Sequence, residues 1–308
     1  MNFLQQGEKD KRDGAMYLLT LILVFLSFLY GMYTSAYIAE GHLGYSLLEK
    51  IPEGQEAIAF GLQLLPFVFG FATLLLSIKF LNKRPIRSAF TIRERFDWKR
   101  FLAMFAVWGG ILTIFLCIGF AMQDPIELQF NPSKFFPLLF FALILIPIQT
   151  TTEDLMFRGY LFQGFATLGK ISIFGKYPFA SLSKSGLTGI LILGGLFGYL
   201  HIGNPEVLLL GKGIVIYYIS TGVFMGLLTH FDDGLELGMG YHAANNLFGV
   251  LILSTDWQVF QTNSVFIDHS PPSFGWDLIL SLIVLQPLII FLFYKIYKWK
   301  GVKEKLMK

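Results

Sequence analysis

Apolar residues form long runs along this chain, separated by short polar or basic segments. A helix needs about 20 apolar residues to cross the hydrocarbon of a bilayer, so the pattern predicts about eight membrane-spanning helices. The fifth and seventh are short and rich in glycine. The fourth is unusually long, because it runs through Glu153–Arg158 and has the composition to continue to Leu168. The predicted spans lie near residues 15–37, 57–80, 101–122, 135–165, 187–203, 213–230, 238–254 and 276–297.

The composition agrees with an all-α polytopic integral membrane protein. Of the 308 residues, 54% are hydrophobic and 15% are charged, whereas about a quarter of the residues of a soluble domain are charged. Lipid must therefore solvate much of the apolar surface. The first apolar run begins near Ala15 and is longer than a signal-peptide core of roughly 7–15 residues. We expect it to be retained as the first span.

Lysine and arginine residues predict the orientation of the spans, because basic residues are retained on the cytoplasmic side. They are concentrated near the N-terminus, in the loop Lys79–Arg100, in the loop Lys170–Lys184 and in the tail Lys295–Lys308. Both termini are therefore predicted to be cytoplasmic, with the acidic loop Asp232–Glu236 as an exception. We interpret the basic loop as a topology signal facing anionic lipid, rather than as a nucleic-acid site.

Cysteine and glycine residues add packing information but no chemistry. Cys117 is the single cysteine, so an intramolecular disulfide is excluded, and we interpret its side chain as a small buried apolar group. Gly194 with Gly198 and Gly222 with Gly226 have the small-xxx-small spacing that lets two membrane helices approach closely.

Ionisable side chains inside a span are costly to bury and by default indicate a functional site. Once loops and span ends are set aside, the candidates are Glu153, Asp154, Arg158, His201 and His242. Asn245 and Asn246 add amide groups to the same deep region. The other histidines lie in loops or at span ends and are interpreted as solvated: His42, His230 and His269.

The first candidate group is Glu153-Asp154-x-x-x-Arg158. Asp154 and Arg158 are four residues apart, so they pair on one face of a helix. Glu153 is rotated by about 100° from Asp154 and is left to face elsewhere. A carboxylate in that position suits proton transfer. The alternative is structural, with the arginine pairing both acids.

Two further groups bring imidazoles and an amide. Phe197 and His201 share one helix face, and His242 and Asn246 share another. An imidazole and an amide on one face are able to donate two hydrogen bonds to a single oxygen, as oxyanion stabilisation requires. The alternatives are a hydrogen-bonded structural histidine and a pair of interhelical polar links. Together the three groups match activation of water followed by attack on a carbonyl.

In this order the motifs resemble those of the CPBP intramembrane proteases, which include type II CAAX prenyl endopeptidases and the bacteriocin-processing or immunity proteins of the Abi family. The family motifs Glu-Glu-x-x-x-Arg, Phe-x-x-x-His and His-x-x-x-Asn correspond to Glu153–Arg158, Phe197–His201 and His242–Asn246. One departure is that Asp154 replaces the second glutamate, which keeps both its charge and its spacing from Arg158. The resemblance covers roughly 135–255 and divides the chain into an N-terminal membrane extension with about three spans (1–134), the protease core (135–255), and a final span with a basic cytoplasmic tail (256–308).

The resemblance implies an intramembrane endopeptidase with a defined division of labour. Glu153 and His201 would activate water, His242 and Asn246 would hold the oxyanion, and Arg158 would order the first motif through Asp154. Phe197 supports the second motif. We expect no cofactor; the alternative is a zinc ion held by the glutamate and the two histidines.

Strict alternation of the spans places His201 and His242 at opposite membrane depths, although one site needs both at the same depth. Short, broken or re-entrant segments around Gly203–Lys212 and Gly234–Gly240 would reconcile them, because irregular backbone is tolerated where it lines a cavity.

The expected partners are membrane lipids and a peptide or protein substrate, lipidated or not, and no nucleic acid. The expected location is a bacterial cytoplasmic membrane. Two rivals are a proton-coupled transporter, which predicts inverted repeats that this sequence does not show, and a non-catalytic immunity or scaffold protein.

Overall fold

The computed structural model describes residues 3–9, 15–47, 51–165, 167, 185–273 and 275–307. Within these residues, seven helical segments are long and apolar enough to cross a membrane. An eighth helix, α9 (Glu236–Leu251), has 16 residues and is mostly buried among the others. The chain is therefore an all-α polytopic integral membrane protein, as the sequence predicts.

The predicted spans correspond to observed helices with small shifts at their ends. The fourth continues as one helical segment through Phe165, and its predicted extension to Leu168 lies outside the described residues. The α-helices before the fifth span are α1 (Ala15–Ile38), α2 (Glu56–Leu76), α3 (Trp98–Met122), α4 (Pro132–Asp154) and α5 (Phe162–Phe165). They are followed by α6 (Gly186–Leu200), α7 (Pro205–Leu210), α8 (Gly213–Asp232), α9, α10 (Trp276–Leu280), α11 (Gln286–Tyr297) and α12 (Val302–Met307).

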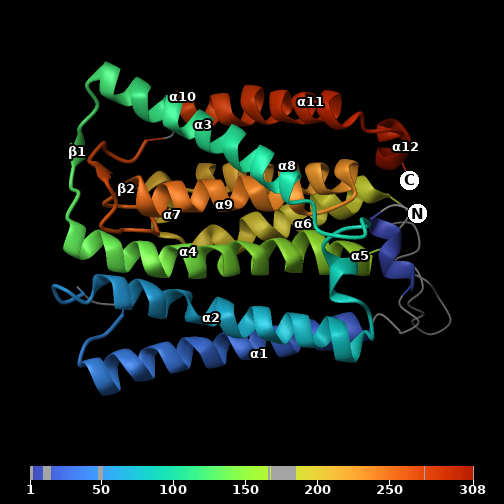
Figure 1. The fold of residues 1–308 in the computed structure, drawn as a ribbon, viewed down its shortest axis with the longest axis horizontal. Coiled ribbons are helices and arrows are strands. Elements are labelled where there is room, and N and C mark those ends of the chain that lie inside the picture. The colour runs from blue at the N-terminus through green and yellow to red at the C-terminus, as the bar shows by residue number, and fades with distance from the viewer. Residues whose placement is uncertain are drawn as a thin grey trace.

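The helices form layers around α9. Helices α1 and α2 pack on each other at one edge, α2 contacts α4, and α4 contacts α9 (Figure 1). Helix α3 packs against α9 from the other side, and α6 pairs with α8. The two ends of the chain lie at the same end of the bundle (Figure 1). The helix that carries His242 and Asn246 is thus the one most enclosed by protein.

A small sheet that the sequence did not predict lies at the end of the bundle opposite the termini (Figure 1). Its strands are β1 (Ile126–Leu128), β2 (Leu253–Thr255) and β3 (Phe266–Asp268), in the order β1-β3-β2. Strand β3 pairs antiparallel with β1 and parallel with β2. The predicted seventh span, 238–254, is therefore wrong at its end, because the helix stops at Leu251 and the next residues enter the sheet.

Glycines bring α6 and α8 into backbone contact, as their spacing predicts. A Cβ atom placed on Gly194 would lie 2.8 Å from the backbone nitrogen of Val223 and 3.2 Å from the carbonyl carbon of Gly222. Any larger side chain at Gly194 would force the two helices apart.

Ion pairs explain the acidic loop that broke the charge pattern. Arg93 pairs with Asp232 at 3.0 Å and with Glu236 at 3.1 Å, and Arg100 also pairs with Asp232. The indole of Trp299 donates a hydrogen bond of 2.7 Å to Asp232. The loop Asp232–Glu236 is therefore neutralised by basic residues at the same end of the bundle, which removes the conflict with its predicted side.

Two sequence-based interpretations of single residues are wrong. His230 is not solvated: it is fully buried, and its Nε2 donates a 2.8 Å hydrogen bond to the carbonyl of Lys305 in α12. Cys117 is not buried: it lies on the exposed face of α3. The reasons differ: lipid accepts the exposed side chain of Cys117, whereas the C-terminal helix α12 packs on the end of α8 and covers His230.

Candidate active site

The first motif lies where α4 changes its helical form. Glu153 and Asp154 end the α-helix, and residues Leu155–Leu161 (η5) continue it as a π-helix before α5. Such π-helical insertions occur frequently at functional sites, because the extra residue per turn redirects the side chains that follow. Pro147 lies nearly two turns earlier inside α4, and its missing N–H leaves a gap in the helical hydrogen bonding.

Asp154 and Arg158 form the predicted pair. The Nη1 atom of Arg158 lies 2.5 Å from Oδ1 of Asp154, and the two side chains are 3% and 1% exposed. The guanidinium also lies over the ring of Phe197, 4.3 Å from its centroid. Its Nε and Nη2 atoms and Oδ2 of Asp154 have no hydrogen-bond partner among the described residues. The pair thus links the first motif to the phenylalanine of the second.

Glu153 faces away from that pair, as its rotation on the helix predicts. The side-chain amide of Gln149, one turn earlier, donates a 2.6 Å hydrogen bond to Oε1 of Glu153. Its other oxygen, Oε2, is buried and makes no hydrogen bond within the described part of the chain. One carboxylate oxygen is therefore held while the other remains available.

His242 lies between the two acids. Its Nδ1 is 3.4 Å from Oδ1 of Asp154, and its Nε2 is 3.7 Å from Oε2 of Glu153. A carboxylate only accepts, so Nδ1 carries the proton of the shorter contact. The longer contact exceeds a direct hydrogen bond and has the length at which a water molecule bridges polar groups.

An amide chain joins α4 to α9 and α3. Asn246 donates a 2.9 Å hydrogen bond to Oε1 of Gln149, Asn245 donates to Asn246 at 3.2 Å, and Trp108 donates to Asn245 at 3.2 Å. Sequence reasoning missed the part played by Gln149. The signal was present, because a glutamine in an apolar span, four residues before Glu153, shares its helix face.

His201 lies at the end of α6 and has a defined tautomer. Its Nδ1 is 2.7 Å from the carbonyl oxygen of Phe197, and a carbonyl only accepts, so the proton is on Nδ1 and Nε2 presents a lone pair. Within the described residues, His201 makes no hydrogen bond to Glu153 or His242. It approaches them through the Phe197 ring, whose centroid is 4.5 Å from that of His201 and 6.3 Å from that of His242.

The shortness of helix α6 bears on the predicted conflict in depth between His201 and His242. Helix α6 has 15 residues and spans about 22 Å, less than the hydrocarbon thickness of about 30 Å. The chain then turns through His201–Gly203 (η8) and α7 before it returns along α8. The ring of His201 therefore packs beside that of Phe197, which in turn faces His242. The segment Gly203–Lys212 has the broken form expected, whereas Gly238 and Gly240 lie within the regular helix α9.

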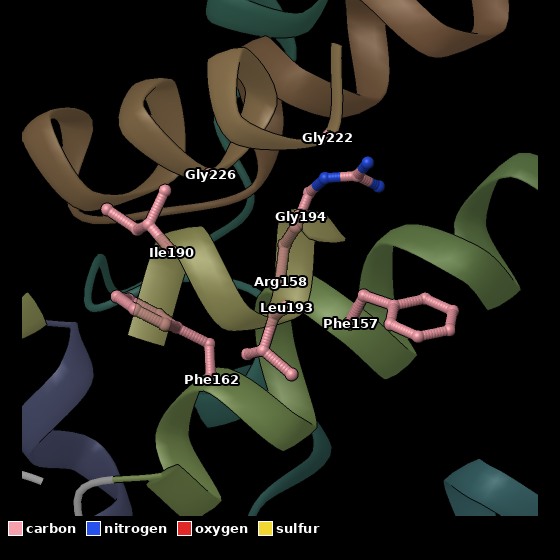
Figure 2. Close-up of a pocket in the computed structure, with 8 residues that line it drawn as sticks. All are labelled: Phe157, Arg158, Phe162, Ile190, Leu193, Gly194, Gly222 and Gly226. Carbon is pink, nitrogen blue, oxygen red and sulfur yellow. The ribbon is translucent and has the colours of Figure 1, made fainter. Parts of the chain in front are cut away.

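An apolar pocket adjoins the site between η5, α6 and α8. Arg158 lies on its wall and points toward the helix that carries Gly222 (Figure 2). Glycines of both α6 and α8 contribute to its lining. The lining residues are Phe157, Arg158, Phe162, Ile190, Leu193, Gly194, Gly222 and Gly226.

The arrangement has the parts required for hydrolysis: a carboxylate with one available oxygen, an imidazole with a lone pair, and donors on a facing helix. Among the described residues, no three His, Cys, Asp or Glu side chains are grouped so as to hold a metal ion. Metal-free chemistry remains a prediction, and a chelator tests it below.

Comparison with known proteins agrees with the resemblance in the motifs. Residues 132–248 match the family model described as type II CAAX prenyl endopeptidase Rce1-like. The chain is 35% identical over 205 residues to YyaK, an uncharacterized protein of Bacillus subtilis (strain 168), and the alignment covers 65% of this chain and 61% of YyaK. No solved structure matches the chain.

Proposed function

We propose that this chain, whose residues 132–248 match the model of type II CAAX prenyl endopeptidases described as Rce1-like, hydrolyses peptide bonds within the membrane. One observation carries the proposal. Glu153 is held through Oε1 by Gln149, while its unpartnered Oε2 faces the imidazole of His242 at 3.7 Å. A purely structural carboxylate at this depth would be expected to have both oxygens paired.

Water activation is assigned to Glu153 and His201. Glu153 Oε2 accepts a proton from water, and the lone pair on Nε2 of His201 accepts a hydrogen bond from the same molecule or from the tetrahedral intermediate. The carbonyl of Phe197 keeps His201 in the tautomer that this role needs. Proton transfer by a positioned side chain contributes about 10²–10⁴ in rate.

Oxyanion binding is assigned to His242 and Asn246. Asn246 uses one amide hydrogen for Gln149 and has a second for the substrate oxygen. His242 directs Nδ1 toward Asp154, so Nε2 donates to an oxyanion when the ring carries both protons. Asp154, which is itself paired with Arg158, holds the imidazole in place.

The finer features belong to the same proposal. The substrate is a peptide or protein whose scissile bond enters the membrane, either with a prenylated tail or as a leader peptide, and no metal takes part. The location is a bacterial cytoplasmic membrane with both termini inside. Orientation is supported by the basic residues that surround the acidic loop at the same end as both termini. Fusion of alkaline phosphatase to the C-terminus should give no periplasmic activity, and strong activity would contradict this orientation.

The test compares wild type with Glu153→Ala in liposomes, on a library of quenched peptides that includes prenylated ones, with and without a chelator. Wild type should cleave some members, and the variant should lose at least about 10²-fold in rate while keeping its thermal unfolding midpoint. Glu127→Ala, an exposed glutamate outside the family match, is the matched control. Unchanged cleavage by Glu153→Ala would overturn the mechanism, and loss of activity on chelation would overturn its metal-free form.

A further inference from the structure

Another buried carboxylate lies beyond His201, on a helix to which no role has been assigned. Glu206, in α7, is 5% exposed. Its Oε1 accepts hydrogen bonds from the hydroxyl of Tyr218 and, at 3.0 Å, from the side-chain amide of Asn204. Its Oε2 is buried without a partner among the described residues. Burying a carboxylate costs free energy unless hydrogen-bond partners compensate for the lost water. The partners of Glu206 therefore indicate its role.

Tyr218 connects that carboxylate to the candidate base. Its ring stacks on the imidazole of His201, with the centroids 4.4 Å apart and the planes at 22°. The Phe197 ring contacts the same imidazole at 4.5 Å. His201 is thus enclosed by two aromatic rings, of which one is anchored at its hydroxyl by Glu206.

We propose that Tyr218 and Glu206 are positioning residues that orient His201 for water activation, with Glu206 acting through the hydroxyl of Tyr218. This inference rests on the proposed function, since it concerns the base of that reaction. Neither residue touches the reacting atoms.

The need for an external anchor follows from the position of His201. Its own backbone has left the α-helix and lies in the short η8 turn, so the regular helix no longer fixes the side chain. The one hydrogen bond to Phe197 fixes the tautomer but allows the ring to tilt. A stacked ring restricts that tilt, and the bond from Tyr218 to Glu206 restricts the stacked ring. A donated hydrogen bond to a carboxylate also enriches the phenol ring in electron density, which favours the imidazole when it gains a proton.

The ionisable groups around His201 come from four elements. Tyr218 faces it from α8, and Glu206 stands behind Tyr218 on α7. Arg158 on η5 and His242 on α9 lie on the far side of the Phe197 ring. The two sides are therefore separable by substitution, because the Phe197 ring lies between them.

Kinetics on a cleaved peptide provide the first test. Tyr218→Leu removes the stack and should lower kcat about 100-fold with KM nearly unchanged, as expected for a displaced catalytic group. Tyr218→Phe keeps the ring and loses the anchor, and Glu206→Gln loses the charge; each should lower kcat roughly tenfold. Their double variant should be no worse than Tyr218→Phe alone, because both act through one hydroxyl. Tyr199→Phe, on the exposed face of α6, and Glu127→Gln are the matched controls.

Dependence on His201 separates positioning from general stability. In a His201→Ala background, Tyr218→Phe should have no further effect on the residual rate. A full additional loss there would overturn the proposal, as would additive losses in the double variant.

A measurement that does not need cleavage keeps this inference distinct from the proposed function. Ring-¹⁵N NMR of histidine-labelled protein in liposomes, with the His201 signals assigned from His201→Ala, should show shifted or broadened signals in Tyr218→Phe and Glu206→Gln but not in Tyr199→Phe. Unchanged His201 signals in Tyr218→Leu would overturn the positioning role even if the enzyme is active. If wild type cleaves nothing, the proposed function fails, and the NMR result still decides whether these residues orient His201.

Discussion

Two pairs of acids in this molecule, one fully buried and one partly exposed at Glu153, have opposite arrangements. Asp232 and Glu236, at the end of the bundle that holds the termini, have fully buried side chains and face Arg93 and Arg100. Glu153 and Asp154, at the end of α4, have a single arginine near them, Arg158, and it pairs with Asp154. In the first pair, two arginines neutralise two acids. In the second, one acid is left to face a histidine.

The difference separates structural charge from charge kept for chemistry. At Asp232 the hydrogen bond from Trp299 adds to the two arginines, so each acid oxygen there has a partner. In the other pair, Oε2 of Glu153 and Oδ2 of Asp154 have no hydrogen-bond partner among the described residues. Unpartnered buried polar atoms cost stability, and proteins retain such costs at functional sites. Substitutions should therefore affect folding at one pair and turnover at the other.

The largest effect on stability is expected for Asp232→Ala. It leaves Arg93, Arg100 and the Trp299 indole without their shared acceptor, and breaking a buried ion pair costs about 3–5 kcal/mol. Thermal unfolding in detergent should show a clear fall in midpoint. Glu153→Ala removes one unpartnered oxygen together with one that accepts a hydrogen bond from Gln149, and should change the midpoint little. Equal losses in the two variants would break the comparison.

Asn246→Ala tests the same contrast on the catalytic side. If Asn246 donates to the oxyanion, its loss should lower kcat by roughly 10²–10³ while a measurable rate remains. The midpoint should change little. Asn245→Ala is the neighbouring control, because its amide contacts Asn246 and Trp108 rather than the proposed oxyanion. A larger effect on rate at Asn245 than at Asn246 would contradict the assigned roles.

Gln149→Leu should give the smallest of the three effects, a modest fall in kcat. It removes the donor to Glu153 and the acceptor for Asn246 while keeping the volume of the side chain, so the two groups lose their mutual alignment. We expect kcat to fall about tenfold, the value of one hydrogen bond to a charged group. Gln149→Glu places a second carboxylate beside Glu153 and should be worse than leucine. A normal rate in both variants would remove Gln149 from the site.

Several features of the site were readable from residue spacing alone. The 3.6-residue helical period places Asp154 and Arg158 on one face and turns Glu153 away from that pair. The approach of α6 to α8 follows from the glycine spacing. Gln149 was equally readable, since it shares the face of Glu153, but it was overlooked because a neutral amide does not stand out as a charge does. The three-residue strands of the small sheet carry too few residues for an alternating pattern to be recognised.

By itself the sequence determined the apolar spans, the all-α membrane fold and the motif residues, because helical periodicity and the cost of burying charge act locally along the chain. Only the tertiary structure decided that α6 ends at Leu200 and that the His201 ring then packs on Phe197, whose ring also faces His242. It also decided that Arg93 and Arg100 neutralise the loop at Asp232 and that α12 buries His230. The hydrogen bond from Tyr218 to Glu206 is a third such contact. These are contacts between segments distant in the chain, and their free energies depend on which helices pack together rather than on any local pattern.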